Sequence, residues 1–222
     1  MNDYVHKVVS DFRKQAYPDI ALYMKAYMKN KFEFLGIKSP DRRTISKSAL
    51  SKDSLPATEQ IWPTIYTLWD LPEREFQYFA MELIAKYKKS VNKDWIKNYE
   101  NLIISKSWWD TVDFIAATLV GHYFKVFPDM IKTVTGAWMQ SGNIWLQRTC
   151  LIFQLKYKDE VDTELLTSFI KELCVSKEFF IAKAIGWSLR EYSKRNPSWV
   201  LDFVQKNTLQ PLSKREALKR IV

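Results

Sequence analysis

The stretch NIWLQRTCLIFQLKY, residues 143–157, can be laid over EFFIAKAIGWSLREY, residues 178–192. Each stretch has an aromatic residue in its third position and ends in tyrosine, and Arg148 lies over Lys183. The offset between the two stretches is 35 residues, and one further step back along the chain reaches Asp113. Helix–turn–helix units of about 35–45 residues are typical of helical repeat proteins. The alignment therefore predicts a repeated pair of helices.

Amphipathic periodicity extends this pattern along most of the chain. In EREFQYFAMELIAKY (73–87), apolar residues recur at spacings of three and four, as one face of an α-helix requires. No stretch alternates cleanly with a period of two, so we expect no β-sheet. Breaks such as SPD (39–41) and SGN (141–143) predict short loops between helices. We expect an all-α fold, a curved α–α superhelix (solenoid) of HEAT-like repeats, with one domain over residues 1–222.

The composition limits the partners of this protein. Its 222 residues include 34 Lys and Arg against 25 Asp and Glu, a formal net charge of +9. This excess fits nucleic acid or an anionic membrane surface, and it fits a lysine-rich soluble surface equally well. No apolar run approaches the ~20 residues that a membrane span needs, and the N-terminus does not resemble a signal peptide. Cys150 and Cys174 form no disulfide framework, which favours a reducing cytoplasm.

Three charged residues, Asp113, Arg148 and Lys183, share one position of the repeat. Charged side chains are rarely buried without partners, so we expect this position to face a groove. Trp109 precedes Asp113 by four residues and Trp187 follows Lys183 by four, which places each pair on one helix face. Cations interleaved with aromatic rings favour nucleic-acid binding. The pattern alone favours a non-catalytic helical scaffold that binds nucleic acid or a protein partner, since helical repeats most often serve as interaction surfaces.

Seven stretches carry a resemblance that covers nearly the whole chain. They are FLGIKSPDRR (34–43), LWDLPEREFQ (68–77), SKSWWDTVD (105–113), NIWLQRT (143–149), IFQLKYK (152–158), SKEFFIAKAIGWSLREY (176–192) and PLSKREALK (211–219). Together they resemble the AlkD-type DNA alkylation repair enzymes, which are bacterial alkylpurine DNA glycosylases built from HEAT-like repeats. The resemblance implies excision of cationic alkylated purines, such as 3-methyladenine and 7-methylguanine, from duplex DNA.

The resemblance also implies roles for single residues. Asp113 matches the family's catalytic aspartate, and Trp109 and Trp187 match two tryptophans that flank the deoxyribose of the lesion. Arg148 matches an arginine that contacts the DNA backbone near the lesion. The other residues expected to bind DNA are Tyr27, Lys156 and Arg190, to which the repeat adds Lys183.

The chemistry of such a lesion suits these residues. Alkylation at N3 or N7 makes the purine cationic, so the base departs as a neutral molecule and needs no general acid. The deoxyribose becomes oxocarbenium-like, and the Asp113 carboxylate would stabilise it and orient the attacking water. The indole faces of Trp109 and Trp187 would attract the same cations. We therefore expect a monofunctional hydrolase, monomeric and cytoplasmic, whose partner is double-stranded DNA and which uses no cofactor, metal or membrane.

The remaining conspicuous residues are expected to be structural. A tryptophan at helical spacing is usually a packing residue, so Trp108 and Trp145 are expected in the core or between helices. Asp110 is expected to be a solvated acid near the start of its helix. His6 and His122 have no acids at ligand spacing, and the sequence predicts no metal site around them.

Overall fold

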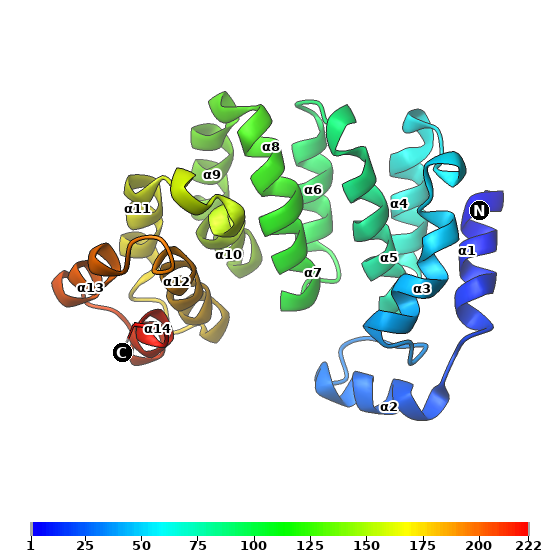
Figure 1. The fold of residues 1–222 in the computed structure, drawn as a ribbon, viewed down its shortest axis with the longest axis horizontal. Helices are drawn as coiled ribbons and strands as arrows, with labels where there is room; N and C mark the ends of the chain where they lie inside the picture. The colour runs from blue at the N-terminus through cyan, green and yellow to red at the C-terminus, as the bar shows by residue number, and fades with distance from the viewer. Residues whose placement is uncertain (1, 222) are drawn as a thin grey trace. The chain divides into compact units, whose positions relative to one another are not determined.

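The computed structural model describes residues 2–221, and this part of the chain is helical with no strand (Figure 1). A single isolated bridge joins Glu33 and Glu73. The predicted all-α, helical-repeat fold is confirmed. The chain divides into two compact units, Met1–Val91 and Asn92–Val222. A single domain over residues 1–222 therefore stays a prediction.

From residue 2 onward, the first unit contains five α-helices, and two of them have proline in the first turn. They are α1 (Asp3–Arg13), α2 (Pro18–Tyr27), α3 (Ser39–Ala49), α4 (Ile61–Asp70) and α5 (Arg74–Ile84). Proline in the first turn of α2 and α3 fits there because that turn has no intrahelical acceptor for its N–H groups. Short 3₁₀ turns cover Lys52–Ser54, Thr58–Gln60 and Ala85–Ser90.

A buried glutamate organises the loop before α3. Glu75 is fully buried, and its carboxylate accepts hydrogen bonds from the backbone N–H groups of Leu35, Gly36 and Ile37 at 3.0, 2.9 and 3.0 Å. Burial raises the pKa of Glu75 although these N–H groups act in the opposite direction. Gly36 has a φ of 85°, and a Cβ there would lie 2.1 Å from the carbonyl oxygen of Tyr17. Only glycine fits this close approach.

Up to residue 221, the second unit contains nine α-helices, α6 to α14. They are α6 (Trp95–Ile104), α7 (Trp109–Phe114), α8 (Gly121–Val126), α9 (Ile131–Gln140), α10 (Ile144–Ile152), α11 (Thr163–Leu173), α12 (Phe179–Tyr192), α13 (Pro197–Lys206) and α14 (Pro211–Leu218). A π-helical segment, Ile115–Val120, joins α7 to α8. Short 3₁₀ turns cover Pro128–Met130, Phe153–Lys156 and Lys158–Glu160.

Within the second unit, alternate helices form a row. Helix α10 contacts α7 on one side and α12 on the other, and α12 contacts α14 (Figure 1). Helices α6, α9, α11 and α13 pack against members of this row. Side chains cap several starts: Asn143 accepts from the backbone N–H of Trp145 at 2.9 Å, and Asn196 accepts from that of Trp199 at 3.0 Å. The row α7–α10–α12–α14 is the element that carries the repeated charged position.

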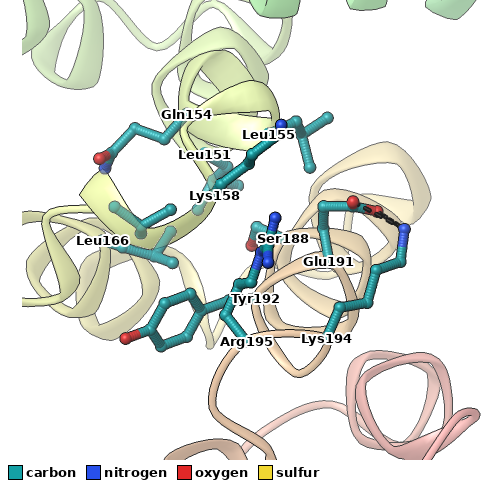
Figure 2. Close-up of a pocket in the computed structure, with 11 residues that line it drawn as sticks. Leu151, Gln154, Leu155, Lys158, Leu166, Ser188, Glu191, Tyr192, Lys194 and Arg195 are labelled. Atoms are coloured by element: carbon teal, nitrogen blue, oxygen red, sulfur yellow. Dashed lines mark hydrogen bonds and ion pairs between the residues drawn. The ribbon is translucent and has the colours of Figure 1, made fainter.

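A cavity of about 240 Å³ lies between the end of α10 and the end of α12 (Figure 2). Apolar side chains, including Leu151, Leu166 and Tyr192, line it together with an ion pair between Lys194 and Glu191 at 2.6 Å. The cavity shares no residue with the predicted catalytic set. None of the helices found within residues 2–221 combines the length and the apolar character of a membrane span.

Candidate functional site

The turn before α7 separates the two adjacent tryptophans. Lys106 adopts a left-handed conformation with φ 47°, and the Ser107 hydroxyl donates to the carbonyl of Ile103 at 2.6 Å. Trp108 is extended, with φ −159°, and occupies the N-cap position of α7, whereas Trp109 is the first helical residue. The neighbouring indoles therefore leave the chain from different backbone conformations. Trp109 is half-buried and stands one helical turn before Asp113.

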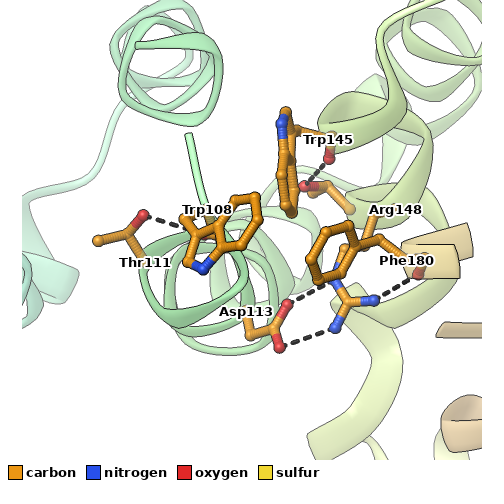
Figure 3. A network of polar contacts seen from close by, with 7 residues as sticks. Trp108, Thr111, Asp113, Trp145, Arg148 and Phe180 are labelled. Atoms are coloured by element: carbon orange, nitrogen blue, oxygen red, sulfur yellow. Dashed lines mark hydrogen bonds and ion pairs between the residues drawn. The ribbon is translucent and has the colours of Figure 1, made fainter. Parts of the chain in front are cut away.

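Asp113 on α7 and Arg148 on α10 form a bidentate ion pair (Figure 3). The Arg148 Nε and Nη2 atoms donate to the two carboxylate oxygens at 2.7 and 2.8 Å, and Nη1 donates to the carbonyl of Phe180 at 2.5 Å. The side chain of Arg148 is 5% exposed and that of Asp113 is 15% exposed. Parallel N–H···O bonds of this kind are strong and fix orientation. The pair joins helices of successive repeats, at the spacing of 35 residues.

This geometry differs from the expectation that Arg148 faces an open groove. Its guanidinium is buried, and three of its N–H groups are used inside the protein. The physical reason is that Asp113, one repeat earlier, supplies the opposite charge that makes burial of the arginine tolerable. The DNA contact that the resemblance implies for Arg148 stays a prediction, and only the remaining N–H groups of its terminal nitrogens could serve it.

Three aromatic rings, Trp108, Trp145 and Phe180, pack together beside the ion pair, and we call them the aromatic cluster. The Phe180 ring centroid lies 4.9 Å from those of Trp108 and Trp145, and the two indoles are 5.7 Å apart. The Arg148 guanidinium carbon lies 5.9 Å from the Phe180 ring (Figure 3). Trp108 and Trp145 are packing residues, as the sequence predicted. Phe180 was missed, although it aligns with Trp145 in the two repeats.

Two opposing influences act on the Asp113 carboxyl. Burial, the larger, raises its pKa, and the hydrogen bonds and positive charge of Arg148 lower it. Asp110, on the same helix, adds a smaller upward influence. Without Arg148, burial would act unopposed and favour the neutral acid. The arginine is therefore the group that favours a carboxylate at this partly buried position.

The other predicted site residues are distributed over the chain. Trp187 is half-buried on α12. Lys156 is exposed at the end of a 3₁₀ turn, and its ammonium donates to the Thr118 hydroxyl at 2.6 Å. Tyr27, 71% exposed at the end of α2, belongs to the other compact unit. The DNA contact expected of Tyr27 therefore stays a prediction.

Lys183 and Arg190 meet a partner that the sequence analysis missed. Glu216 on α14 accepts from the Lys183 ammonium at 3.0 Å and forms an ion pair with Arg190 through its other oxygen. Glu216 follows Lys183 by 33 residues, close to the repeat spacing. That spacing was the available signal, within the quoted stretch PLSKREALK (211–219). Elsewhere in the described part of the chain, no three His, Cys, Asp or Glu side chains gather as metal ligands would.

These features define an all-helical repeat protein. Its row α7–α10–α12–α14 carries charged side chains at the repeated position, and the Asp113 carboxylate among them is largely buried. The family model of the DNA alkylation repair enzymes matches residues 8–221, and the chain belongs to this family. A solved structure described as a predicted DNA alkylation repair enzyme from Enterococcus faecalis is 33% identical to it. That match covers 93% of this chain and 97% of the other, with a TM-score of 0.86. No curated protein matches the chain.

Proposed function

We propose that this protein is a monofunctional DNA glycosylase. It would hydrolyse the N-glycosidic bond of cationic alkylated purines, such as 3-methyladenine and 7-methylguanine, in duplex DNA. Membership of the DNA alkylation repair enzyme family supports a role in repair of alkylated DNA. The observation that carries the proposal is the Asp113 carboxylate, which Arg148 holds by two hydrogen bonds at a partly exposed position of the helix row.

A fixed carboxylate fits the charge that develops during this reaction. As the bond to the cationic base breaks, the base leaves as a neutral purine and positive charge builds on the deoxyribose. A carboxylate already oriented near C1′ stabilises that charge without reorganising, and it can direct the attacking water. Arg148 would act through Asp113, as a positioning residue that favours the ionised form. Hydrolysis of the N-glycosidic bond consumes only water, so the proposal includes no cofactor.

The half-buried tryptophans complete the proposed site. Indole faces attract cations by about 0.5–2 kcal/mol, depending on desolvation. Trp109 stands one turn from Asp113 and Trp187 one turn from Lys183, which are positions suited to contact with the lesion's sugar. Lys156, Lys183 and Arg190 would meet DNA phosphates. We further propose HEAT-like repeats, a bacterial cytoplasmic location and a monomer.

Single-turnover excision from a duplex with one 7-methylguanine tests the proposal. Asp113→Asn keeps the size of the side chain and removes its charge. We expect the excision rate to fall about 10- to 1000-fold, since such electrostatic groups contribute about 2–4 kcal/mol. DNA binding should stay equal or become slightly tighter, because a negative charge near phosphates is gone. Circular dichroism and a thermal melt would check that the variant is folded.

Asp110→Asn is the matched control, because Asp110 lies on the same helix and the charge change is the same. Its excision rate should stay within a few-fold of the parent. A rate for Asp113→Asn within twofold of the parent would remove Asp113 from the mechanism. That result would favour the second candidate, a non-catalytic helical scaffold, because helical repeats most often serve as binding surfaces.

A further inference from the structure

Helix α12 presents two cations on one face with Trp187 between them. Lys183 precedes Trp187 by four residues and Arg190 follows it by three, so all three side chains point to the same side of the helix. Lys183 remains 37% exposed and Arg190 22% exposed. Both are among the residues proposed to meet DNA phosphates.

The carboxylate of Glu216 forms ion pairs with both Lys183 and Arg190. One oxygen pairs with Lys183 at 3.0 Å, and the other pairs with Arg190. The Glu216 side chain is only 11% exposed, so it is not a solvated surface acid. The hydrogen bond from Lys183 is the largest influence that lowers its pKa, and Arg190 adds to it. Glu216 is therefore charged at neutral pH and neutralises part of the positive face of α12.

Close packing of α14 against α12 fixes Glu216 in this position. A Cβ on Gly186 would lie 2.5 Å from the Cβ of Glu216 and 2.8 Å from the Ser213 carbonyl oxygen. The Ser213 hydroxyl donates to the carbonyl of Ala182 at 2.8 Å. Gly186 thus permits the two helices to approach closely beside the ion pairs. The packing of α14 against α12 therefore holds Glu216 beside Lys183 and Arg190.

We propose that Glu216 is an internal counter-ion that limits the affinity of this protein for DNA by competing with phosphate for Lys183 and Arg190. The inference rests on the proposed function, because it requires α12 to face DNA. Carboxylate and phosphate oxygens use the same donors on lysine and arginine. A phosphate that binds either cation must share it with Glu216 or displace the carboxylate. Binding to undamaged DNA is mostly electrostatic, so this competition weakens it and speeds release from undamaged sites.

The test is the salt dependence of binding to an undamaged duplex. Glu216→Gln keeps the shape of the side chain and removes its charge. We expect affinity to rise roughly three- to tenfold, and the slope of log affinity against log salt to steepen by about 1–2, as for one or two additional phosphate contacts. Damage to the packing of α14 would lower affinity instead. A gain with a steeper slope therefore separates the counter-ion role from a purely structural one.

Two further variants define the result. Asp129→Asn makes the same charge change and breaks an exposed ion pair, the one with Lys93 at 2.5 Å, within the same unit. It should change affinity and slope much less. Glu216→Asp keeps the charge but has a shorter reach, and it should give a smaller gain than Glu216→Gln. It also provides a measurement if the amide variant does not fold.

The failures can be distinguished. If the parent protein binds DNA with no salt dependence, both the proposed function and this inference are wrong. If the parent binds as expected but Glu216→Gln binds more weakly or with an unchanged slope, only the counter-ion role is overturned. An equal gain in Asp129→Asn would also overturn it, because net charge alone would then explain the effect.

Discussion

Burial raises the pKa of two carboxylates, the fully buried Glu75 in α5 and the largely buried Asp113 in α7, yet their partners differ in kind. Glu75 is fully buried and accepts from three backbone N–H groups of residues 35–37. Asp113 is 15% exposed and accepts from one side chain, that of Arg148. A carboxylate bound to backbone holds the fold in one conformation. Asp113 also keeps part of its side chain exposed, where a substrate could approach it. Burial and pKa direction alone do not distinguish these roles.

The largest expected effect concerns Glu75 and the stability of the fold. Glu75→Ala would leave three buried N–H groups of residues 35–37 without their acceptor. We expect the free energy of unfolding to fall by about 3–5 kcal/mol, because buried N–H groups that lose a carboxylate acceptor stay without a hydrogen bond. Urea unfolding followed by circular dichroism would measure the change. Glu59→Ala, at an exposed position of the same unit, should stay within about 0.5 kcal/mol of the parent. A loss below about 1 kcal/mol for Glu75→Ala would contradict its structural role.

The next largest effect concerns Arg148, the side-chain partner of Asp113. Glu75 accepts from backbone N–H groups instead. Arg148→Gln leaves the Asp113 carboxylate partly buried without its cation. We expect a loss of about 2–4 kcal/mol in unfolding free energy at neutral pH. The double variant Arg148→Gln/Asp113→Asn should lose less than the sum of its single changes, because no unpaired charge then remains. Additive losses would mean that the ion pair contributes nothing beyond its separate side chains.

The same variant has a defined pH signature. Arg148 lowers the pKa of Asp113 against the effect of burial, so its removal should raise that pKa further. In the proposed mechanism the excision rate needs the carboxylate, and the acid limb of the rate should therefore move to higher pH in Arg148→Gln. For stability the sign is opposite to that of an ordinary ion-paired acid. A carboxyl whose folded pKa is raised contributes stability below its unfolded pKa and loses it as pH rises through the folded pKa. An acid limb unchanged in Arg148→Gln would show that Arg148 does not control the ionisation of Asp113.

The sequence predicted more of the fold than of the site's contacts. Helical periodicity and proline at helix starts were sufficient for the all-α repeat fold, because both act locally. The 35-residue offset placed Asp113 and Arg148 on corresponding helices of successive repeats, and the two side chains are in contact. The offset did not show that Arg148 is buried, because a spacing in the sequence does not say where a side chain points. Glu75 was not recognised because its partners are backbone groups about 40 residues earlier, which no pattern of side chains indicates. Glu216 was missed because a step of 35 residues from Lys183 reaches Leu218, and Glu216 lies two residues before it.

The smallest expected effect concerns Lys156, which is exposed, whereas Glu75 is fully buried and Asp113 is largely buried. Its ammonium donates to the Thr118 hydroxyl at 2.6 Å, and its exposed side chain could also meet a phosphate. Lys156→Gln should weaken binding to damaged and undamaged duplexes alike, by about 0.5–1 kcal/mol, and reduce the salt slope by about 1. Titrations of both duplexes at several salt concentrations would measure this. Lys132→Gln removes the same charge from α9, which is not a member of the row α7–α10–α12–α14, and it should change the slope less. Equal effects of the two variants would show that Lys156 adds only to net charge, and a loss confined to the damaged duplex would mean that it contacts the lesion.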